Sequence, residues 1–394
     1  MQLATIGFGN AGGKIVDRLL EYEQNRGGAF CRFVGAFNTA KVDLQKLEYV
    51  PEEYRVLYGQ TDERSKGHGV GADPDVGADV TRKDLGEIER VLDGVPLHDV
   101  DAFLLVAGLG GGTGSGGAPV VASELAAKYD EPVYGLGILP SQDEGGRAAL
   151  NAGRALRSFT EGTDGLLLFD NEAWRDGTDS VAAGYERTNR EIAKRFASLL
   201  GAGVEDGGQI SENAMDASDV RRTLGTGGVS TVAYGEAELE ASTRRSRGLL
   251  DRLRSSDDGV SEDGADAATK IYGLVRRAVR SRLTCPASIE SAERAMIVVS
   301  GPREEFSRKG LERSREWLEA EIGSAEVLAG DDPRPGADVL SATILLANVT
   351  DVPRIDHLQE QAVSAQDNIE EQAADRDEEI QELVTDPDNE LDPV

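Results

Sequence analysis

The sequence has little basic charge and almost no cysteine. Lysine and arginine together number 42 against 72 acidic residues, which gives a formal net charge of −30. Nucleic acids and anionic membranes repel such a chain, so nucleic-acid binding is not expected. The two cysteines, Cys31 and Cys285, cannot form a disulfide framework. We expect them to be buried small side chains in a reducing compartment.

Long apolar runs are also missing. No stretch reaches the ~18–20 apolar residues that span a bilayer, and the first residues lack the pattern of a signal peptide. A cytoplasmic protein without direct membrane insertion is therefore expected. The 39% of apolar residues is enough to fill two cores in a chain of 394 residues. The acidic surplus resembles that of proteins from a salt-loaded cytoplasm, which points to a halophilic source.

The first half alternates short apolar runs with amphipathic stretches, a pattern typical of a parallel sheet covered by helices. Strands are expected at LATIGF, FVGAFN, FLLVAG, PVYGLGIL and GLLLFDN. Helices are expected at residues 14–22, 82–92, 119–128 and 144–161. A longer helix over residues 185–200 has one apolar stripe, and the glycines that follow would end it.

The second half has a more mixed order, which predicts an α+β domain. Strands are expected at GVSTVAYGEAE, RAMIVVSGP and SATILLANV, with helices near residues 267–282 and 304–322. Residues 351–394 hold 15 acids against two arginines and few apolar side chains, which predicts a disordered acidic tail. The predicted domains are a Rossmann-like α/β domain (1–182), a core helix with its linker (183–206), an α+β domain (207–350) and the tail (351–394).

Two glycine-rich loops follow predicted strands. GFGNAG, residues 7–12, stands between a strand and a helix, as the dinucleotide-binding pattern requires, although a tight turn alone would also explain it. The next strand ends in Asn38 and Thr39, not in the acid with which a dehydrogenase holds the ribose. The second loop, GLGGGTGSGG at residues 108–117, has seven glycines whose neighbouring N–H groups can converge on phosphates. Two such loops predict a nucleotide with several phosphates.

GLGGGTGSG resembles the signature loop of the tubulin/FtsZ superfamily, and further motifs follow in the family's order up to about residue 350. GFGNAGGK, FNTAK (37–41) and GHGVGADPDVG (67–77) are similar to its first three nucleotide loops. Through these four loops the resemblance implies nucleotide contacts at Gly7, Gly9, Asn10, Ala11, Gly12, Asn38, Thr39, Gly71, Ala72, Gly108, Gly110, Gly111, Gly112, Thr113, Gly114, Ser115 and Gly116.

Further segments resemble the family's sugar and base contacts. LPSQDEGGR (139–147) lies where the family contacts the ribose, which implies Arg147 and either Asp143 or Glu144. FDNEAW (169–174) is similar to the tubulin segment that presents an asparagine to guanine, here Asn171. Tyr185 and Asn189, four residues apart on the long helix, match the family's stacking aromatic and base-reading amide. The resemblance implies GTP and GDP as ligands, with Mg²⁺ whose protein ligands stay open.

ISENAMDASDVRR (210–222) resembles the family's synergy loop, N-x-x-D-x-x-D, at Asn213, Asp216 and Asp219. In the family this loop lies at the opposite end of the subunit from the nucleotide. The resemblance therefore implies a GTPase activated by self-assembly, in which these residues act on the γ-phosphate held by the next molecule of a head-to-tail filament. From the residues alone, the acids could equally be favourable charges at a helix N-terminus.

The mixture of tubulin-like and FtsZ-like segments in an acidic chain is similar to the archaeal CetZ group. That resemblance implies a cytoskeletal role in cell shape or motility, at the inner cell envelope when assembled. The implied partners are further copies of the chain and proteins that bind the tail or link it to the membrane. The alternatives are an FtsZ-type division-ring protein, a nucleotide-binding scaffold without turnover and a dinucleotide-dependent oxidoreductase.

Overall fold

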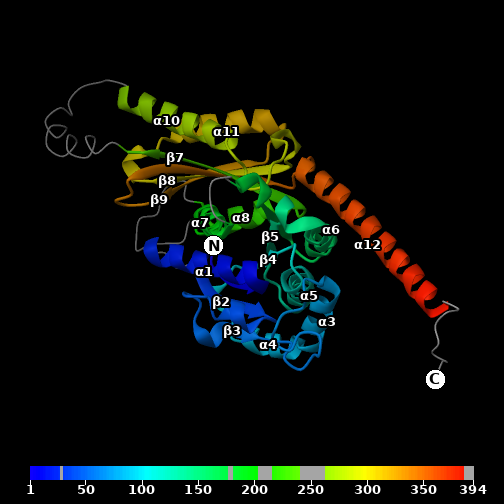
Figure 1. Ribbon diagram of the computed structural model, residues 1–394. Helices are drawn as coiled ribbons and strands as arrows, with labels where there is room; N and C mark the ends of the chain where they lie inside the picture. The colour runs from blue at the N-terminus through cyan, green and yellow to red at the C-terminus, as the bar shows by residue number, and fades with distance from the viewer. Residues whose placement is uncertain (27–29, 176–180, 203–214, 240–261, 386–394) are drawn as a thin grey trace.

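The computed structural model describes residues 1–26, 30–175, 181–202, 215–239 and 262–385 (Figure 1). One ten-stranded sheet runs through this part of the chain in the order β3-β2-β1-β4-β5-β6-β7-β10-β8-β9. The strands are β1 (Leu3–Phe8), β2 (Cys31–Asn38), β3 (Arg55–Leu57), β4 (Ala102–Gly108), β5 (Val133–Leu139), β6 (Gly165–Asp170), β7 (Val229–Glu238), β8 (Arg294–Gly301), β9 (Val327–Pro333) and β10 (Val339–Ala347). The α-helices are α1 (Gly9–Arg26), α2 (Lys41–Leu44), α3 (Pro74–Lys83), α4 (Leu85–Leu92), α5 (Thr113–Lys128), α6 (Gly145–Glu161), α7 (Val181–Leu200), α8 (Ala217–Leu224), α10 (Glu262–Val279), α11 (Arg308–Ile322) and α12 (Pro353–Thr385).

The first half of the sheet is parallel from β3 to β6. All residues of β1, β5 and β6 are buried, as in parallel strands that helices cover on both faces. The strand order reverses between β1 and β4. Ligands of such sheets bind beyond the carboxyl ends of the strands at the reversal point, so a site is expected after β1 and β4.

The second half continues the same sheet. β7 pairs in parallel with β6 through two residue pairs, Leu166 with Val229 and Leu167 with Ser230. Beyond this junction β10 is antiparallel to both β7 and β8, while β9 runs parallel to β8. α10 and α11 pack against each other and against these strands (Figure 1). The predicted Rossmann-like first half and α+β second half are confirmed; the boundaries assigned to the domains stay predictions.

α7 connects the two halves of the molecule, and its position agrees with the helix expected at residues 185–200. Its apolar stripe is buried, with Ile192, Phe196 and Leu199 fully inaccessible. The helix ends beside the start of β1, where the Met1 nitrogen donates to the Leu200 carbonyl at 2.7 Å. Because α7 has 20 residues, it is about 30 Å long.

α5 begins six residues earlier than the sequence predicted. Glycine disfavours helix interiors, so the expected start was near Pro119, but the helix already begins at Thr113. Tertiary packing decides this difference. A Cβ atom at Gly116 would lie 2.1 Å from the Pro74 carbonyl oxygen of α3, a contact that no other residue could make. The glycines therefore let α3 and the first turn of α5 touch.

The prediction of a disordered tail is wrong for residues 353–385, which form α12. Leu358, Ala362 and Ala365 recur with helical spacing and are buried along α6, where Ala365 packs on Gly146. The average composition of residues 351–394 is polar and acidic, so it does not reveal a narrow apolar stripe of this kind. Residues 386–394 of the predicted tail lie outside the described residues. Neither α12 nor any other helix in the described ranges is long and apolar enough to cross a membrane.

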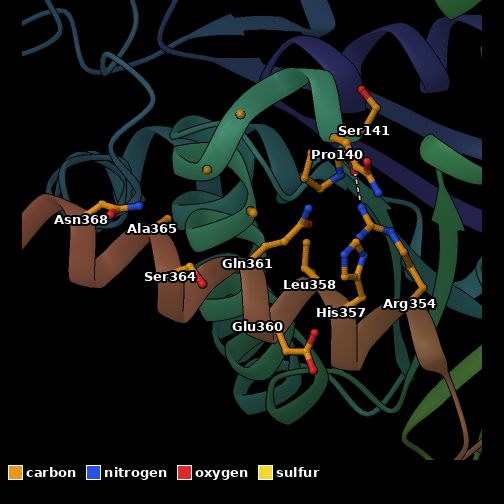
Figure 2. A pocket seen from close by; sticks show the side chains of 14 residues that line it. Pro140, Ser141, Arg354, His357, Leu358, Glu360, Gln361, Ser364, Ala365 and Asn368 are labelled. Atoms are coloured by element: carbon orange, nitrogen blue, oxygen red, sulfur yellow. Dashed lines mark hydrogen bonds between the residues drawn. The ribbon is translucent and has the colours of Figure 1, made fainter.

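A buried ion pair ties the start of α12 to the sheet. Arg354 Nε donates to Asp170 Oδ1 at 3.0 Å, and both side chains are more than nine-tenths buried. Burial raises the pKa of Asp170, and the Arg354 guanidinium opposes that rise. Arg354 Nη2 also donates to the Pro140 carbonyl at 2.8 Å (Figure 2). The helix therefore packs on the chain that leaves β5 and β6.

Candidate functional site

A cavity of about 480 Å³ opens beyond the carboxyl ends of β1 and β4. Two helices begin at its wall, α1 at Gly9 and α5 at Thr113. The free N–H groups and the dipole of a helix N-terminus attract anions, and here two N-termini face one space. Of the predicted nucleotide contacts, those that line the cavity are Gly9, Asn10, Ala11, Asn38, Gly71, Ala72, Gly108, Gly110, Gly111, Gly112, Thr113, Gly114, Glu144, Asn171, Tyr185 and Asn189.

The first and fourth loops touch each other at the base of the cavity. Gly9 has a φ of 69°, and a Cβ there would lie 3.0 Å from the Gly114 nitrogen. A larger residue at position 9 would push the two helix N-termini apart. The second loop joins the same floor, because the Thr39 and Thr113 hydroxyls lie 2.7 Å apart.

The third loop, residues 67–77, packs against the second loop at the cavity. The Gly69 nitrogen donates to the Thr39 carbonyl at 3.0 Å, so this loop is bonded to the second one. Gly71 and Ala72 follow with φ values of 62° and 56°. Alanine rarely adopts this left-handed conformation, and such residues are held in place by surrounding contacts.

Asn151, which no sequence pattern singles out, supplies that contact. Its side-chain amide donates to the Ala72 carbonyl at 2.8 Å and to the Gly110 carbonyl at 3.0 Å. One buried side chain on α6 therefore holds the third and fourth loops together. Nothing distinguishes this asparagine from other polar helix residues in the sequence, because its role depends on two loops that are distant along the chain.

Asn151→Ala is expected to weaken nucleotide binding by up to about thirtyfold, because it removes two hydrogen bonds worth about 1 kcal/mol each. Titration of a fluorescent nucleotide checks this result. The exposed Asn368 on α12 gives a matched control, and Asn368→Ala should bind as the wild type does. Equal affinities of the two variants would show that Asn151 does not hold the loops.

On the ribose side, the structure separates the two candidate acids. Glu144 lines the cavity and accepts hydrogen bonds from the Ser141 nitrogen at 2.8 Å and the Tyr185 hydroxyl at 3.2 Å. Asp143 is exposed and forms an ion pair with Arg175 instead. Arg147 is exposed and is not among the lining residues. Of the two acids, Glu144 is therefore the one that lines the cavity.

On the base side, α7 and the turn after β6 provide the wall. Tyr185 and Asn189 lie one turn apart near the start of α7, and Asn171 follows β6. The Tyr185 side chain is 38% exposed, an unusual exposure for a large ring, and leaves a face available for stacking. Burial and the adjacent Glu144 carboxylate raise the pKa of Tyr185, so its hydroxyl stays protonated.

Several predicted contacts lie behind the cavity wall. A Cβ at Gly12 would be 2.1 Å from the Val106 carbonyl oxygen, so this glycine serves strand-to-helix packing. Thr39 is fully buried, and the Ser115 hydroxyl donates to the Gly111 and Gly112 carbonyls within α5's first turn. The predicted residues that do not line the cavity are Gly7, Gly12, Thr39, Ser115, Gly116 and Arg147.

Three polar residues that we did not assign to the nucleotide site from the sequence also line the cavity: Lys14, Asp43 and His68. Lys14 lies one helical turn after Asn10, a spacing visible in the sequence. The β-bridge between Ala40 and His68 joins the second and third loops in space. Asp43 and His68 line the cavity beside this bridge. With Glu144 at the ribose side, Asp43 is the other lining carboxylate.

A second cavity of about 390 Å³ lies between α12 and the start of α6 (Figure 2). His357 and Gln361 extend from α12 along it (Figure 2), and Ser141 and Gly146 are among the residues that line it. Pro140 lines both cavities. The short turn after Pro140 therefore separates the second cavity from the ribose side of the first.

The predicted catalytic acids cap α8. Asp216 Oδ1 accepts from the Ser218 nitrogen at 2.7 Å and the Asp219 nitrogen at 3.1 Å, and Asp219 Oδ2 accepts from the Asp216 nitrogen. This capping box is the structural role that the sequence left open as an alternative. The hydrogen bond from the Ser218 hydroxyl helps to lower the pKa of Asp216, which is exposed and ionised. Asn213 lies outside the described residues.

Asp216 and the cavity lie at opposite ends of α7. Tyr185 and Asn189 near the start of this helix face the cavity, whereas Leu200 at its end contacts Met1. The Asp216 charge acts on that same Met1 nitrogen, so the acid lies near the helix end. Tyr185 and Leu200 are 15 residues apart in the chain, about 22 Å along α7, which is too far for Asp216 to reach a phosphate in its own cavity.

The fold and the cavity together define the class of nucleotide-binding proteins, with glycine loops and two helix N-termini at the wall of the cavity. Comparison with known families identifies it further. Residues 2–179 match the model of the tubulin/FtsZ family GTPase domain, and residues 178–364 match the tubulin-like CetZ C-terminal domain. The chain belongs to the tubulin/FtsZ family, within its CetZ group.

Individual relatives support this assignment. The chain is 50% identical to tubulin-like protein CetZ1 of Haloferax volcanii, over 93% of both chains, and 49% identical to CetZ3 of the same organism, over 93% of this chain and 92% of the relative. Among solved structures it is similar to the GDP-bound monomer of Haloferax volcanii CetZ1, with a TM-score of 0.82 and 46% identity over 93% of this chain and all of that one. It is also similar to the GTPγS-bound protofilament of CetZ2 from that organism, with a TM-score of 0.81 and 37% identity over 94% of this chain and 100% of that one.

Proposed function

We propose that this protein binds GTP and GDP in the cavity. The two helix N-termini would hold the phosphates, Glu144 the ribose, and Tyr185, Asn171 and Asn189 the base. The GDP-bound and GTPγS-bound structures of the CetZ1 and CetZ2 relatives support this choice of nucleotide. The absence of a ribose-holding acid after β2, where Asn38 and Thr39 stand, disfavours the dinucleotide alternative.

The protein hydrolyses GTP after polymerising head to tail. The observation that carries this proposal is the separation between the cavity and Asp216, since one molecule cannot bring both to one phosphate. In a head-to-tail contact the α8 end of one subunit covers the cavity of the next. Such a contact does not close on itself and yields a filament. The CetZ2 relative, which was solved as a protofilament, supports self-association.

At that interface the acids of α8 position the attacking water. Asp216 uses Oδ1 for capping α8, which leaves Oδ2 to accept a proton or orient a water molecule. The N–H groups at the starts of α1 and α5 stabilise the charge that develops on the transferred phosphoryl. Mg²⁺, which binds few carboxylates and mostly phosphate and water oxygens, would find Asp43 at the cavity wall and would neutralise phosphate charge.

The cellular role that we propose is control of cell shape or motility. Filaments would form in the cytoplasm at the inner cell envelope and would need linking proteins, since the described helices offer no membrane span. Membership of the CetZ group supports this role over a division ring. Loss of the γ-phosphate would weaken the interface, so hydrolysis would time the lifetime of a filament.

Light scattering after addition of nucleotide tests the proposal. With GTP and Mg²⁺ at high salt, scattering should rise and then decay as phosphate is released, while ATP and GDP should leave it low. Electron microscopy of the same samples should show filaments. Scattering that persists without phosphate release would identify a scaffold without turnover, and no response to GTP would contradict the proposal.

A further inference from the structure

The outer face of α10 carries a cluster of arginines in a protein whose net charge is −30. Residues 267–289, which span most of α10 and the chain that follows it, hold five basic side chains and no acid. Arg277 and Arg280 of this segment are exposed, and Arg276 is half-buried. We call these three arginines, together with the exposed Arg313 of the neighbouring helix α11, the arginine patch.

The arginine patch has no acidic partners. Across the described ranges no ion pair links any of its four guanidiniums to a carboxylate, although acids stand nearby on α11. Glu312 and Glu319 pair with other arginines of α11, and the exposed Glu316 pairs with none. By contrast, Arg18 of α1 has four carboxylates within 3.7 Å. Arginines without acids repel one another, and an anion from outside the chain would relieve that repulsion.

Two aromatic rings lie among the guanidiniums. The Arg313 Cζ atom is 4.2 Å from the centre of the Tyr272 ring, and the Arg276 Cζ atom is 5.4 Å from the same centre. Arg276 also lies 5.6 Å from the Trp317 ring, which meets Tyr272 edge to face. Both rings are half-buried. Such rings hold guanidiniums in place through cation–π contacts, and they suit the boundary between an apolar layer and water.

The arginine patch and α8 lie on opposite sides of the sheet. α10 packs on one face of the second half of the sheet, where Ile271 and Leu274 share a core with Ile297 of β8. α8 packs on the other face, where Val220 shares a core with Met296. Figure 1 shows α10 and α11 on the outer side of this sheet, with the nucleotide-binding half beyond its other face. A head-to-tail filament would therefore leave the patch accessible.

We propose that the arginine patch docks this protein on an anionic lipid surface. The inference goes beyond the proposed nucleotide chemistry, and it adds a direct contact with the membrane to the proposed linking proteins. Each guanidinium can donate two parallel hydrogen bonds to one lipid phosphate. A lipid surface fits better than an acidic protein, because the patch spreads over the outer face of two helices and its rings are of the kind enriched at membrane interfaces.

The net charge of −30 opposes this docking only at long range. Residues 262–322, which include α10 and α11, hold 11 basic and 11 acidic residues, so the acidic surplus lies elsewhere in the chain. Salt screens exposed charges that are more than about 10 Å apart at 0.1 M ionic strength, whereas arginines in contact with phosphates are screened much less. A filament would repeat the patch in every subunit, so that many weak contacts act together.

Sedimentation with lipid vesicles tests the proposal without nucleotide, so its outcome is independent of the proposed GTPase. The wild type should bind vesicles of equimolar phosphatidylglycerol and phosphatidylcholine, bind vesicles of phosphatidylcholine alone much more weakly, and bind less as salt is raised. Arg277→Gln with Arg280→Gln should weaken binding to the anionic vesicles about thirtyfold, because each arginine contributes about fivefold. Both positions are exposed, so this double variant should fold.

A second double variant controls for the change in net charge. Arg82→Gln with Arg157→Gln alters exposed arginines of α3 and α6 and should bind the anionic vesicles as the wild type does. Equal binding by the two double variants would overturn the proposal, as would equal binding of the wild type to neutral and anionic vesicles. If Arg277→Gln with Arg280→Gln abolished bundling of filaments but bound vesicles normally, the patch would serve contacts between copies of the chain, and the proposal would be wrong.

Discussion

Asp216→Asn is expected to reduce GTP hydrolysis about a hundredfold or more while GTP binding stays intact. Asparagine keeps an oxygen for the Ser218 and Asp219 nitrogens and is a good helix N-cap, so α8 should survive. The change removes the charge with which Asp216 would orient water, and such groups contribute about 10²–10⁴-fold to rates. Filaments should consequently form with GTP and persist. Phosphate release and light scattering from the same sample measure both effects.

A matched acid and a mixing experiment control this result. Asp356→Asn changes an exposed acid of α12 and should hydrolyse GTP as the wild type does. Since we propose that the acid acts on the neighbour's nucleotide, Asp216→Asn subunits mixed into wild-type filaments should lower the rate roughly in proportion to their share. Normal turnover by pure Asp216→Asn would remove Asp216 from the mechanism.

Arg354→Ala is expected to destabilise the protein by roughly 3–5 kcal/mol, because it leaves the buried Asp170 carboxylate without its partner. The chain should unfold at lower temperature and lower denaturant concentration, and α12 should become more sensitive to proteases. Thermal unfolding at constant salt and limited proteolysis measure these effects.

The double variant Asp170→Asn with Arg354→Met serves as control, since it removes both charges and keeps similar volumes. Its stability should lie well above that of Arg354→Ala, because burying two neutral groups costs less than burying one unpaired charge. If Arg354→Ala were as stable as the wild type, the ion pair would not hold α12 to the sheet.

Much of the fold was predictable because its strands repeat one simple pattern. The buried runs that became β1, β4, β5 and β6 are apolar apart from a few residues such as Thr5 and Asp170, as is typical of parallel strands that helices cover on both faces. β3 and β9 were missed because they lack that pattern. β3 has only three residues, and β9 ends in Asp331, Asp332 and Pro333, with its acids buried by tertiary contacts. α12 was missed because a few small side chains sufficed to dock it on α6.

The site was predictable where its chemistry lies in the backbone. Glycine loops after strands predict a phosphate site from the sequence, and most of their residues line one cavity. Side chains that act through distant partners were not predictable. Asn151 joins two loops far away in the chain, and Asp43 approaches the cavity through the second loop. The sequence alone could not distinguish Glu144 from Asp143, because the ion pair between Asp143 and Arg175 forms only in the folded chain.

The interfacial site is tested most directly by phosphate release per molecule over a wide range of protein concentrations. Because Asp216 lies at the end of the subunit opposite the cavity, isolated subunits should hydrolyse GTP very slowly. The rate per molecule should rise steeply above the concentration at which scattering first detects filaments. An equal rate per molecule in dilute monomers and in filaments would contradict the interfacial site.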